Sequence, residues 1–98
     1  MKTYTLTVVL KPDLSAEAQK KIGKKVEDLV FSSGGKIEKT ESLGIKTLAY
    51  EIEGNEQASF SRFTLTTSPD KVSGIRSELE RDNNVLRVLV LEGSAKGI

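Results

Sequence analysis

Residues 4–10, YTLTVVL, alternate between apolar and polar side chains with a period of two. Successive side chains of a β-strand point to opposite faces, so this alternation predicts a strand with one buried face. The stretch Lys11-Pro12-Asp13 ends the strand, because proline has no backbone N–H for a ladder and favours a turn. The predicted inward set is Tyr4, Leu6, Val8 and Leu10, and the outward set is Thr5, Thr7 and Val9.

Two later segments repeat apolar residues at three- and four-residue steps, the spacing of one helix face. The first segment predicts a helix over 16–32, with Ser15 as its N-cap and two glycines at its end. The second predicts a helix over 69–81, with a capping hydroxyl from Ser68 and Pro69 at the first helical position. The predicted inward residues are Ala18, Ile22, Val26, Leu29 and Val30 in the first helix, and Val72, Ile75 and Leu79 in the second.

The stretch between the two helical patterns begins with KIEKTESLGIKTLAYEIEG, which is too long for one ordinary strand. Its apolar residues are odd-numbered at first and even-numbered later, and Gly44 lies at the change. An inward set changes parity only where a residue is inserted or the chain reverses. We therefore expect a β-bulge or sharp bend at Gly44, and a tight hairpin is the less favoured alternative. The odd-numbered set is Ile37 and Leu43, and the even-numbered set is Leu48, Tyr50 and Ile52.

The remaining segments complete one fold. Residues 54–59 have the composition of a loop, and strands are predicted over 60–67, with Phe63 and Leu65 inward, and over 85–92, with Val88 and Val90 inward. The order β-α-β-β-α-β, with two right-handed crossovers, predicts an α+β, ferredoxin-like fold. Its four-stranded antiparallel sheet has the order 4-1-3-2, with both helices on one face. We expect a single domain over 1–98 with a short flexible tail over 93–98.

The second face of the predicted sheet has no helix to cover it. By parity this face carries small polar groups, a few apolar side chains and two arginines, and no aromatic clearly occupies it. Single-stranded RNA readers of this fold stack bases on aromatic side chains there, so a reader of that type is disfavoured. A surface that docks a protein and touches RNA phosphates fits better. The expected residues are Thr5, Thr7, Val9, Thr47, Ala49, Arg62, Thr64, Arg87 and Leu89.

The composition excludes several classes of protein. The 98 residues are 37% hydrophobic and 30% charged, which is typical of a globular chain and too polar for a membrane protein. Cysteine, histidine and tryptophan are absent, which removes disulfides, the usual ligands of transition metals and the commonest general base. We therefore expect no enzyme activity, no metal and no cofactor. The N-terminal stretch fits a first strand better than a secretory signal, so a cytoplasmic location is expected.

Charged and glycine-rich clusters favour structural roles. The stretch 38–53 contains four carboxylates, Glu38, Glu41, Glu51 and Glu53. They fit a charged edge strand that resists edge-to-edge pairing better than a catalytic pair of carboxylates that shares a proton. The stretch Gly34-Gly35-Lys36 fits a helix end better than a phosphate-binding loop, because the glycines follow a helix. The lysines at 20, 21, 24 and 25 fit a solvated helix face better than an RNA site. The net charge of +1 means that any nucleic-acid binding is local or shared with a more basic partner.

Three stretches together resemble the bacterial small-subunit ribosomal protein S-six (S6) family. They are MKTYTLTVVLKPDLS, GGKIEKTESLGIKTLAYEI and DNNVLRVLVLE, and the resemblance covers essentially the whole chain in the right order. Gly44, Lys46, Leu48, Ala49, Tyr50 and Ile52 form its most specific part. The resemblance implies a non-enzymatic protein that pairs with a more basic protein, S-eighteen (S18), and binds the central domain of the small-subunit (16S) ribosomal RNA with it.

The same residues suggest where contacts are made. We expect Lys2, Lys46, Arg62 and Arg87 to contact RNA or the partner protein. Leu48, Tyr50 and Ile52 are expected to hold the bent second strand on the core, with Tyr50 as an ordinary core aromatic.

Two other functions remain open at this level. A small-molecule-binding regulatory module of ferredoxin-like fold usually has a glycine-rich turn after its first strand, and residues 11–15 contain no glycine. An acyl-phosphate hydrolase would need an arginine in an anion-binding first loop, where this chain offers only Lys11.

Overall fold

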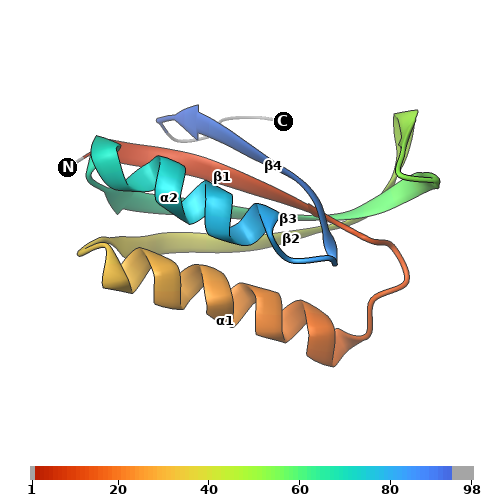
Figure 1. The fold of residues 1–98 in the computed structure, drawn as a ribbon, viewed down its shortest axis with the longest axis horizontal. Helices are drawn as coiled ribbons and strands as arrows, with labels where there is room; N and C mark the ends of the chain where they lie inside the picture. The colour runs from red at the N-terminus through yellow and green to blue at the C-terminus, as the bar shows by residue number, and fades with distance from the viewer. Residues whose placement is uncertain (1, 94–98) are drawn as a thin grey trace.

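The computed structural model describes residues 2–93 and has the predicted element order (Figure 1). Its elements are β1 (Lys2–Leu10), α1 (Ala16–Ser32), β2 (Lys36–Ile52), β3 (Asn55–Thr67), α2 (Pro69–Glu80) and β4 (Val85–Glu92). The strands form one antiparallel sheet in the order β2-β3-β1-β4, which is the predicted 4-1-3-2 read from the other edge. Both helices lie on the same side of the sheet. The predicted ferredoxin-like fold is confirmed.

The first helix has the predicted bounds. The backbone N–H of Ala18 donates to the Ser15 side chain at 3.2 Å, which satisfies one of the free donors of the first turn. Ile22, Val26 and Val30 form its buried stripe. The helix ends where Gly34 adopts a φ of +82°, a conformation that glycine takes without steric cost.

The second helix is one residue shorter than predicted, and its N-cap differs. The Ser68 side chain makes no capping hydrogen bond, so the predicted hydroxyl cap is wrong. The Ser68 backbone carbonyl instead accepts from Lys71 N–H at 2.9 Å. Pro69 opens the helix as predicted, because its missing N–H would have no partner there in any case. Ile75 and Leu79 face the core.

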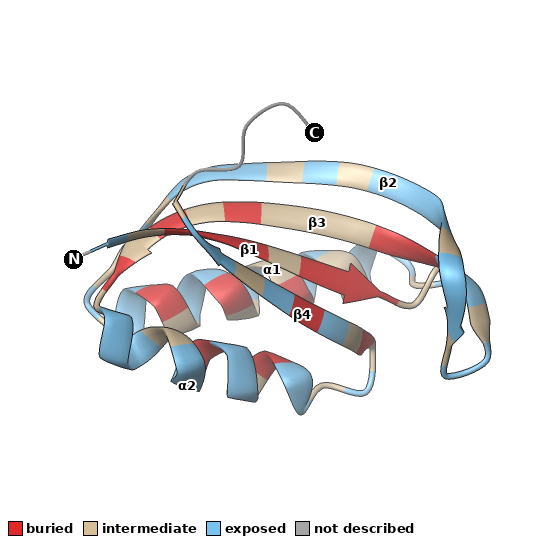
Figure 2. Ribbon diagram, turned by 90° about the horizontal axis from the view of Figure 1, so that it is seen from above, coloured by how far each residue is buried: buried red, intermediate tan, exposed pale blue. Residues whose placement is uncertain are grey.

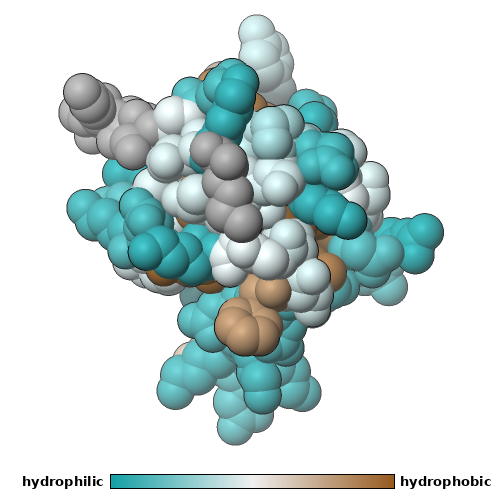
Figure 3. All heavy atoms as spheres, turned by 90° about the vertical axis from the view of Figure 1, so that its left-hand side faces the viewer, coloured by the Kyte–Doolittle hydropathy of each residue, from teal (hydrophilic) through white to brown (hydrophobic). Residues whose placement is uncertain are grey.

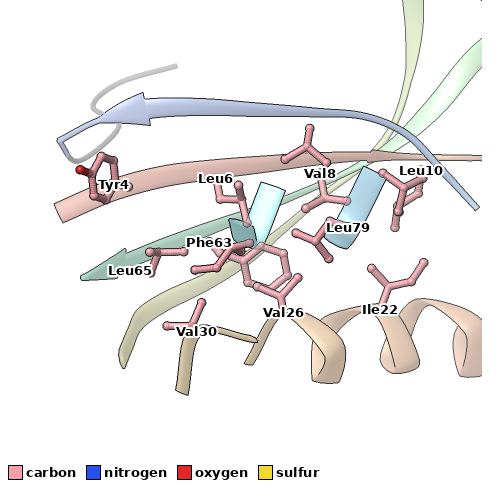
Figure 4. Packing of buried hydrophobic residues seen from close by; sticks show 13 residues of the cluster. Tyr4, Leu6, Val8, Leu10, Ile22, Val26, Val30, Phe63, Leu65 and Leu79 are labelled. Carbon is pink, nitrogen blue, oxygen red and sulfur yellow. The ribbon is translucent and has the colours of Figure 1, made fainter. Parts of the chain in front are cut away.

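The core lies between the two helices and one face of the sheet (Figure 4). Leu6, Val8 and Leu10 of β1 meet Phe63 of β3 and Leu79 of α2 there, all nearly inaccessible to solvent. Each such side chain stabilises the fold by roughly 1.5 to 3 kcal/mol. Thr5 and Val9, predicted to face outward, are also buried, because neighbouring strands flank β1 on both sides.

Gly44 lies at a β-bulge, as predicted. Ser42 pairs with Ser61 and Gly44 pairs with Phe60, so Leu43 is an extra residue with no partner opposite it. Gly44 has a φ of +79°, the left-handed conformation common at such bulges. The chain remains in one strand of 17 residues through the bulge, and further register shifts fall between Ile37 and Lys39 and between Thr47 and Ile52.

The end of β2 and the start of β3 form a hairpin that extends past the helices (Figures 1 and 2). We call residues 47–57 the arm. The loop predicted over 54–59 is wrong, because β3 begins at Asn55 and the turn has only two residues, Glu53 and Gly54. Both have positive φ, the conformation that a two-residue hairpin requires.

The arm corrects the predicted role of Tyr50. Its side chain is 84% exposed, and Leu48 and Ile52 are only half-buried, so none of the three belongs to the core. Ala49 is exposed as well. Parity requires only that the three residues share a face, whereas burial requires a covering layer, and the helices do not reach the arm (Figure 2). Tyr50 is therefore not a core aromatic.

The C-terminal end is only partly described. Gly93, the first residue of the predicted tail, is tied to β1 because its N–H donates to the Thr3 carbonyl at 2.6 Å. Its own carbonyl accepts from the Thr5 hydroxyl at 2.7 Å. The rest of the predicted tail, residues 94–98, lies outside the described residues.

Candidate nucleic-acid and protein interface

The side of the sheet opposite the helices is the candidate site, and we call it the open face. Its composition follows from the strand register, because directly paired residues share a face. Thr7 of β1 pairs with Arg62 of β3 and Leu89 of β4. Val9 pairs with Phe60 and Arg87 in the same way. No described helix covers this face, and Leu89 and Leu91 are 51% and 61% exposed.

Two predictions about the open face were wrong. Phe60 lies on it and is half-buried, so the face does carry an aromatic side chain. Lys46, rather than Thr47, shares the face with Phe60, because Lys46 pairs with Ala58 and Thr47 with Gln57. The cause is a second register shift in β2, between Ile37 and Lys39, which the sequence pattern did not indicate. Each shift exchanges the two sides of the strand beyond it. With Ile37 facing inward, the Gly44 bulge alone would place Thr47 on the open face, whereas the two shifts together place Lys46 there.

Lys46 and Arg87 are the uncompensated cations among the four predicted contact residues. Both side chains are exposed, and within residues 2–93 neither has a carboxylate oxygen within 4.0 Å. Lys46 lines a depression of about 480 Å³ that begins on the open face and also reaches Arg76, Val88 and Val90 on the helix side of β4. Residues lining it include Thr7, Leu43, Phe60, Leu89 and Leu91. Unpaired cations thus lie beside exposed apolar side chains.

Arg62 lies on the same face but is already paired. Its Nε donates to Glu41 Oε1 and its Nη2 donates to Glu41 Oε2, both at 3.1 Å. The Arg62 side chain is only 12% exposed. The hydrogen bond from Arg62 is the main cause that lowers the pKa of the Glu41 carboxyl below its ordinary value. A phosphate would have to compete with Glu41 for this guanidinium.

Lys2 is paired at the far end of the sheet. Its Nζ lies 2.9 Å from Glu92 Oε1, and this hydrogen bond is the main cause that raises the pKa of the lysine. Both side chains are more than half exposed, so the pair is open to water and to competing anions. The structure therefore places Lys46, Arg62 and Arg87 on the open face. Lys2 lies at the end of the sheet where the central strand β1 begins.

The other clusters singled out in the sequence take structural roles. The N–H groups of Gly34 and Gly35 donate to Phe31 and Val30 carbonyls at the end of α1, so this stretch closes a helix. A Cβ on Gly35 would overlap the Thr66 carbonyl oxygen, so the close approach of two backbones requires glycine there. Within residues 2–93, no three acidic side chains gather to hold a metal ion. Neither described helix has the length and hydropathy of a transmembrane span.

Comparison with known proteins agrees with this architecture. The family described as "Ribosomal protein S6" matches residues 3–92. The small ribosomal subunit protein bS6 of Deinococcus radiodurans is 30% identical over 92 residues, which are 94% of this chain and 90% of that protein. The bS6 of Flavobacterium psychrophilum is 31% identical over 91 residues, 93% of this chain and 80% of that protein.

Solved structures support the fold alone. The 30S ribosomal protein S6 of Thermotoga maritima superposes with a TM-score of 0.86 at 16% identity, covering 94% of this chain and 87% of that one. The C-terminal domain of the MgtC protein from Mycobacterium tuberculosis superposes with a TM-score of 0.66 at 15% identity, covering 95% and 88%. The sequence relatives decide the family: this chain belongs to the ribosomal protein S6 family, whose members are structural, non-enzymatic proteins of the small ribosomal subunit in the cytoplasm.

Proposed function

We propose that this protein binds the central domain of the small-subunit (16S) ribosomal RNA together with ribosomal protein S18, and that the open face carries the contacts. The observation that carries the proposal is the juxtaposition of two kinds of surface. Lys46 and Arg87 are exposed cations without a carboxylate partner in the described chain, and Leu89 and Leu91 beside them are exposed apolar side chains. Cations suit phosphates, and exposed apolar side chains suit a protein partner.

The overall charge favours a shared interface. With a net charge of +1, the chain lacks the general positive field that binds nucleic acid without a partner. A basic partner protein would supply most of the phosphate neutralisation, and this chain would add local contacts. Tyr50 fits the same role, because an exposed tyrosine on the arm offers an apolar ring and a polar hydroxyl to an incoming surface.

The test is RNA binding across a salt series. A central-domain transcript of the 16S ribosomal RNA is titrated with the protein in the presence of S18, using Lys46→Glu, Arg87→Glu and the unmodified chain. Each variant should bind more weakly and show a shallower salt dependence, because each loses a phosphate contact. Lys24→Glu is the matched control, because it makes the same charge change on the exposed side of α1. Unchanged binding of both open-face variants across the series would contradict the proposal.

A further inference from the structure

A groove lies at the β2 edge of the sheet, between the last turns of α1 and the first residues of β2. Its volume is about 530 Å³, within the range of ligand-binding clefts. Glu27, Asp28 and Phe31 line it from α1, and Lys36, Ile37 and Lys39 line it from β2. β2 is an edge strand, so no other strand of the described chain pairs with its outer side (Figure 1). The groove is therefore accessible to an extended segment of another chain.

Phe31 is the most unusual residue of this groove. Its side chain is 82% exposed although it follows the buried Val30 directly. One residue along a helix turns the side chain by about 100°, which moves Phe31 off the buried stripe and toward solvent. Figure 3 shows this end of the molecule as a mainly hydrophilic surface from which a hydrophobic side chain projects. Such a ring is buried only when another molecule covers it.

The ring has two carboxylates beside it. Glu27 and Asp28 precede Phe31 by four and three residues, the two spacings that make side chains neighbours on a helix. Neither carboxylate takes part in an ion pair within residues 2–93. Lys24 lies one turn before them and makes no such pair either.

Carboxylates outnumber cations in the lining of the groove, with Glu27, Asp28 and Glu38 against Lys36 and Lys39. Lys36 Nζ lies 3.6 Å from Glu38 Oε1, whereas Lys39 Nζ lies 3.9 Å from Glu41, a carboxylate that Arg62 already holds. The lining is therefore negative by one charge, and Glu27 and Asp28 are its carboxylates without an ion pair in the described part of the chain. These two carboxylates attract a cation, in contrast to the open face.

We propose that this groove binds an arginine-bearing, extended segment of a second, basic protein. A guanidinium is planar, so it can stack on the Phe31 ring while its N–H groups donate to Glu27 and Asp28. An ammonium group lacks that plane and is more strongly hydrated, so arginine is preferred over lysine. The inference does not rest on the proposed RNA contacts, because it concerns a separate surface with the opposite charge.

The test is a titration of the full, ¹⁵N-labelled chain followed by amide chemical shifts. The probe is an Ala-Arg-Val-Arg-Ala peptide, compared with the same peptide carrying lysine or citrulline in place of arginine. The arginine peptide should bind saturably and shift amides over residues 27–40. The lysine peptide should bind more weakly, and the neutral citrulline peptide should not bind detectably.

Variants separate the aromatic contact from simple charge attraction. Phe31→Leu keeps the apolar character but removes the aromatic face, and should weaken the arginine peptide by about three- to thirtyfold. Glu27→Gln and Asp28→Asn should weaken it too, whereas Glu17→Gln, at the other end of the same helix, should not. Equal affinity of Phe31→Leu and the unmodified chain, or shifts spread over all acidic surfaces, would overturn the proposal. Loss of a self-associated form in Phe31→Leu, without peptide binding, would assign the groove to a second copy and also overturn it.

RNA binding measured on Phe31→Leu keeps the two proposals distinguishable. This variant should bind the central-domain transcript as the unmodified chain does, because Phe31 lies outside the open face. If the unmodified chain binds the arginine peptide but not the transcript, the proposed function is contradicted, whereas the proposal that the groove binds an arginine-bearing segment is supported.

Discussion

Arg62 and Glu41 are direct partners across β3 and β2, and the guanidinium donates to both carboxylate oxygens at 3.1 Å. The pair neutralises the centre of the open face, so Lys46 and Arg87 are the predicted contact residues whose charge remains available there. Cross-strand opposite charges stabilise a sheet pairing, and a bidentate geometry is the stronger form of such a contact. Two predictions follow from this pairing.

The first concerns the pH dependence of stability. The folded-state pKa of Glu41 is lowered from 4.5, chiefly by the hydrogen bond from Arg62. The contribution of the pair is therefore present above the unfolded-state value and is lost as the pH falls through the lowered folded-state value. Glu41→Gln should lower the denaturation midpoint at pH 7, and its difference from the unmodified chain should shrink under acid.

Urea denaturation between pH 2 and pH 7 measures this difference. Glu56→Gln on the arm is the matched control, because Glu56 makes no ion pair within the described residues. A Glu41→Gln difference that stays constant with pH would show that the carboxylate charge is not its source.

The second prediction compares how much Lys46, Arg62 and Arg87 each contribute to the salt dependence of RNA binding. Arg62→Gln should change the salt dependence of RNA binding less than Arg87→Gln or Lys46→Gln, because Glu41 already occupies the Arg62 guanidinium. Each of the other two neutralisations should reduce the slope of log affinity against log salt by about 0.7 to 0.9. Filter binding from low to moderate salt measures the slopes. An equal loss for all three variants would mean that Glu41 releases Arg62 on binding.

Glycine substitutions should change stability in opposite directions at two sites. At Gly74, within α2, an added Cβ meets nothing within 4 Å, so Gly74→Ala should stabilise by about 0.5 to 1 kcal/mol. At Gly44 the space is also open, but the φ of +79° is unfavourable for alanine, so Gly44→Ala should destabilise by about 1 to 2 kcal/mol. Thermal and chemical denaturation of both variants compares them directly. Stabilisation by Gly44→Ala would contradict the bulge geometry.

Tyr50 and Phe63 test the assignment of the arm to the surface. Tyr50→Ala should change the free energy of unfolding by no more than about 0.5 kcal/mol, because the side chain is 84% exposed. Phe63→Ala should cost about 3 to 5 kcal/mol, because that ring is 3% exposed in the core. Equilibrium denaturation gives both values. A large loss of unfolding free energy in Tyr50→Ala would show that the Tyr50 side chain is packed in the core.

Much of the fold could be predicted because its signals are local. The 16–32 helix follows from apolar residues spaced at helix intervals, a serine before the first turn and glycines after the last. The bulge at Gly44 follows from a change of parity within one stretch. Neither inference needs any knowledge of which segments lie side by side.

The candidate site was predicted less well because its composition depends on pairing across strands. Phe60 is the exception, because it lies within the predicted strand 60–67 and has the same parity as Arg62, so alternation alone places it on the open face. Lys46 lies on the open face because a register shift between Ile37 and Lys39 precedes the predicted one at Gly44. The Arg62 charge looked available until the register placed Glu41 opposite it.

The sequence by itself determined the element order, the ferredoxin-like topology, the absence of cysteine and histidine chemistry, and the family. Tertiary structure alone decided which outward residues are accessible. In the folded chain Tyr50 is exposed on the arm, and the Arg62 charge is paired with Glu41. Glu27, Asp28 and Phe31 of α1 lie beside the start of β2. The physical reason is that periodicity sets the direction of a side chain, whereas burial and charge compensation depend on what other segments place against it.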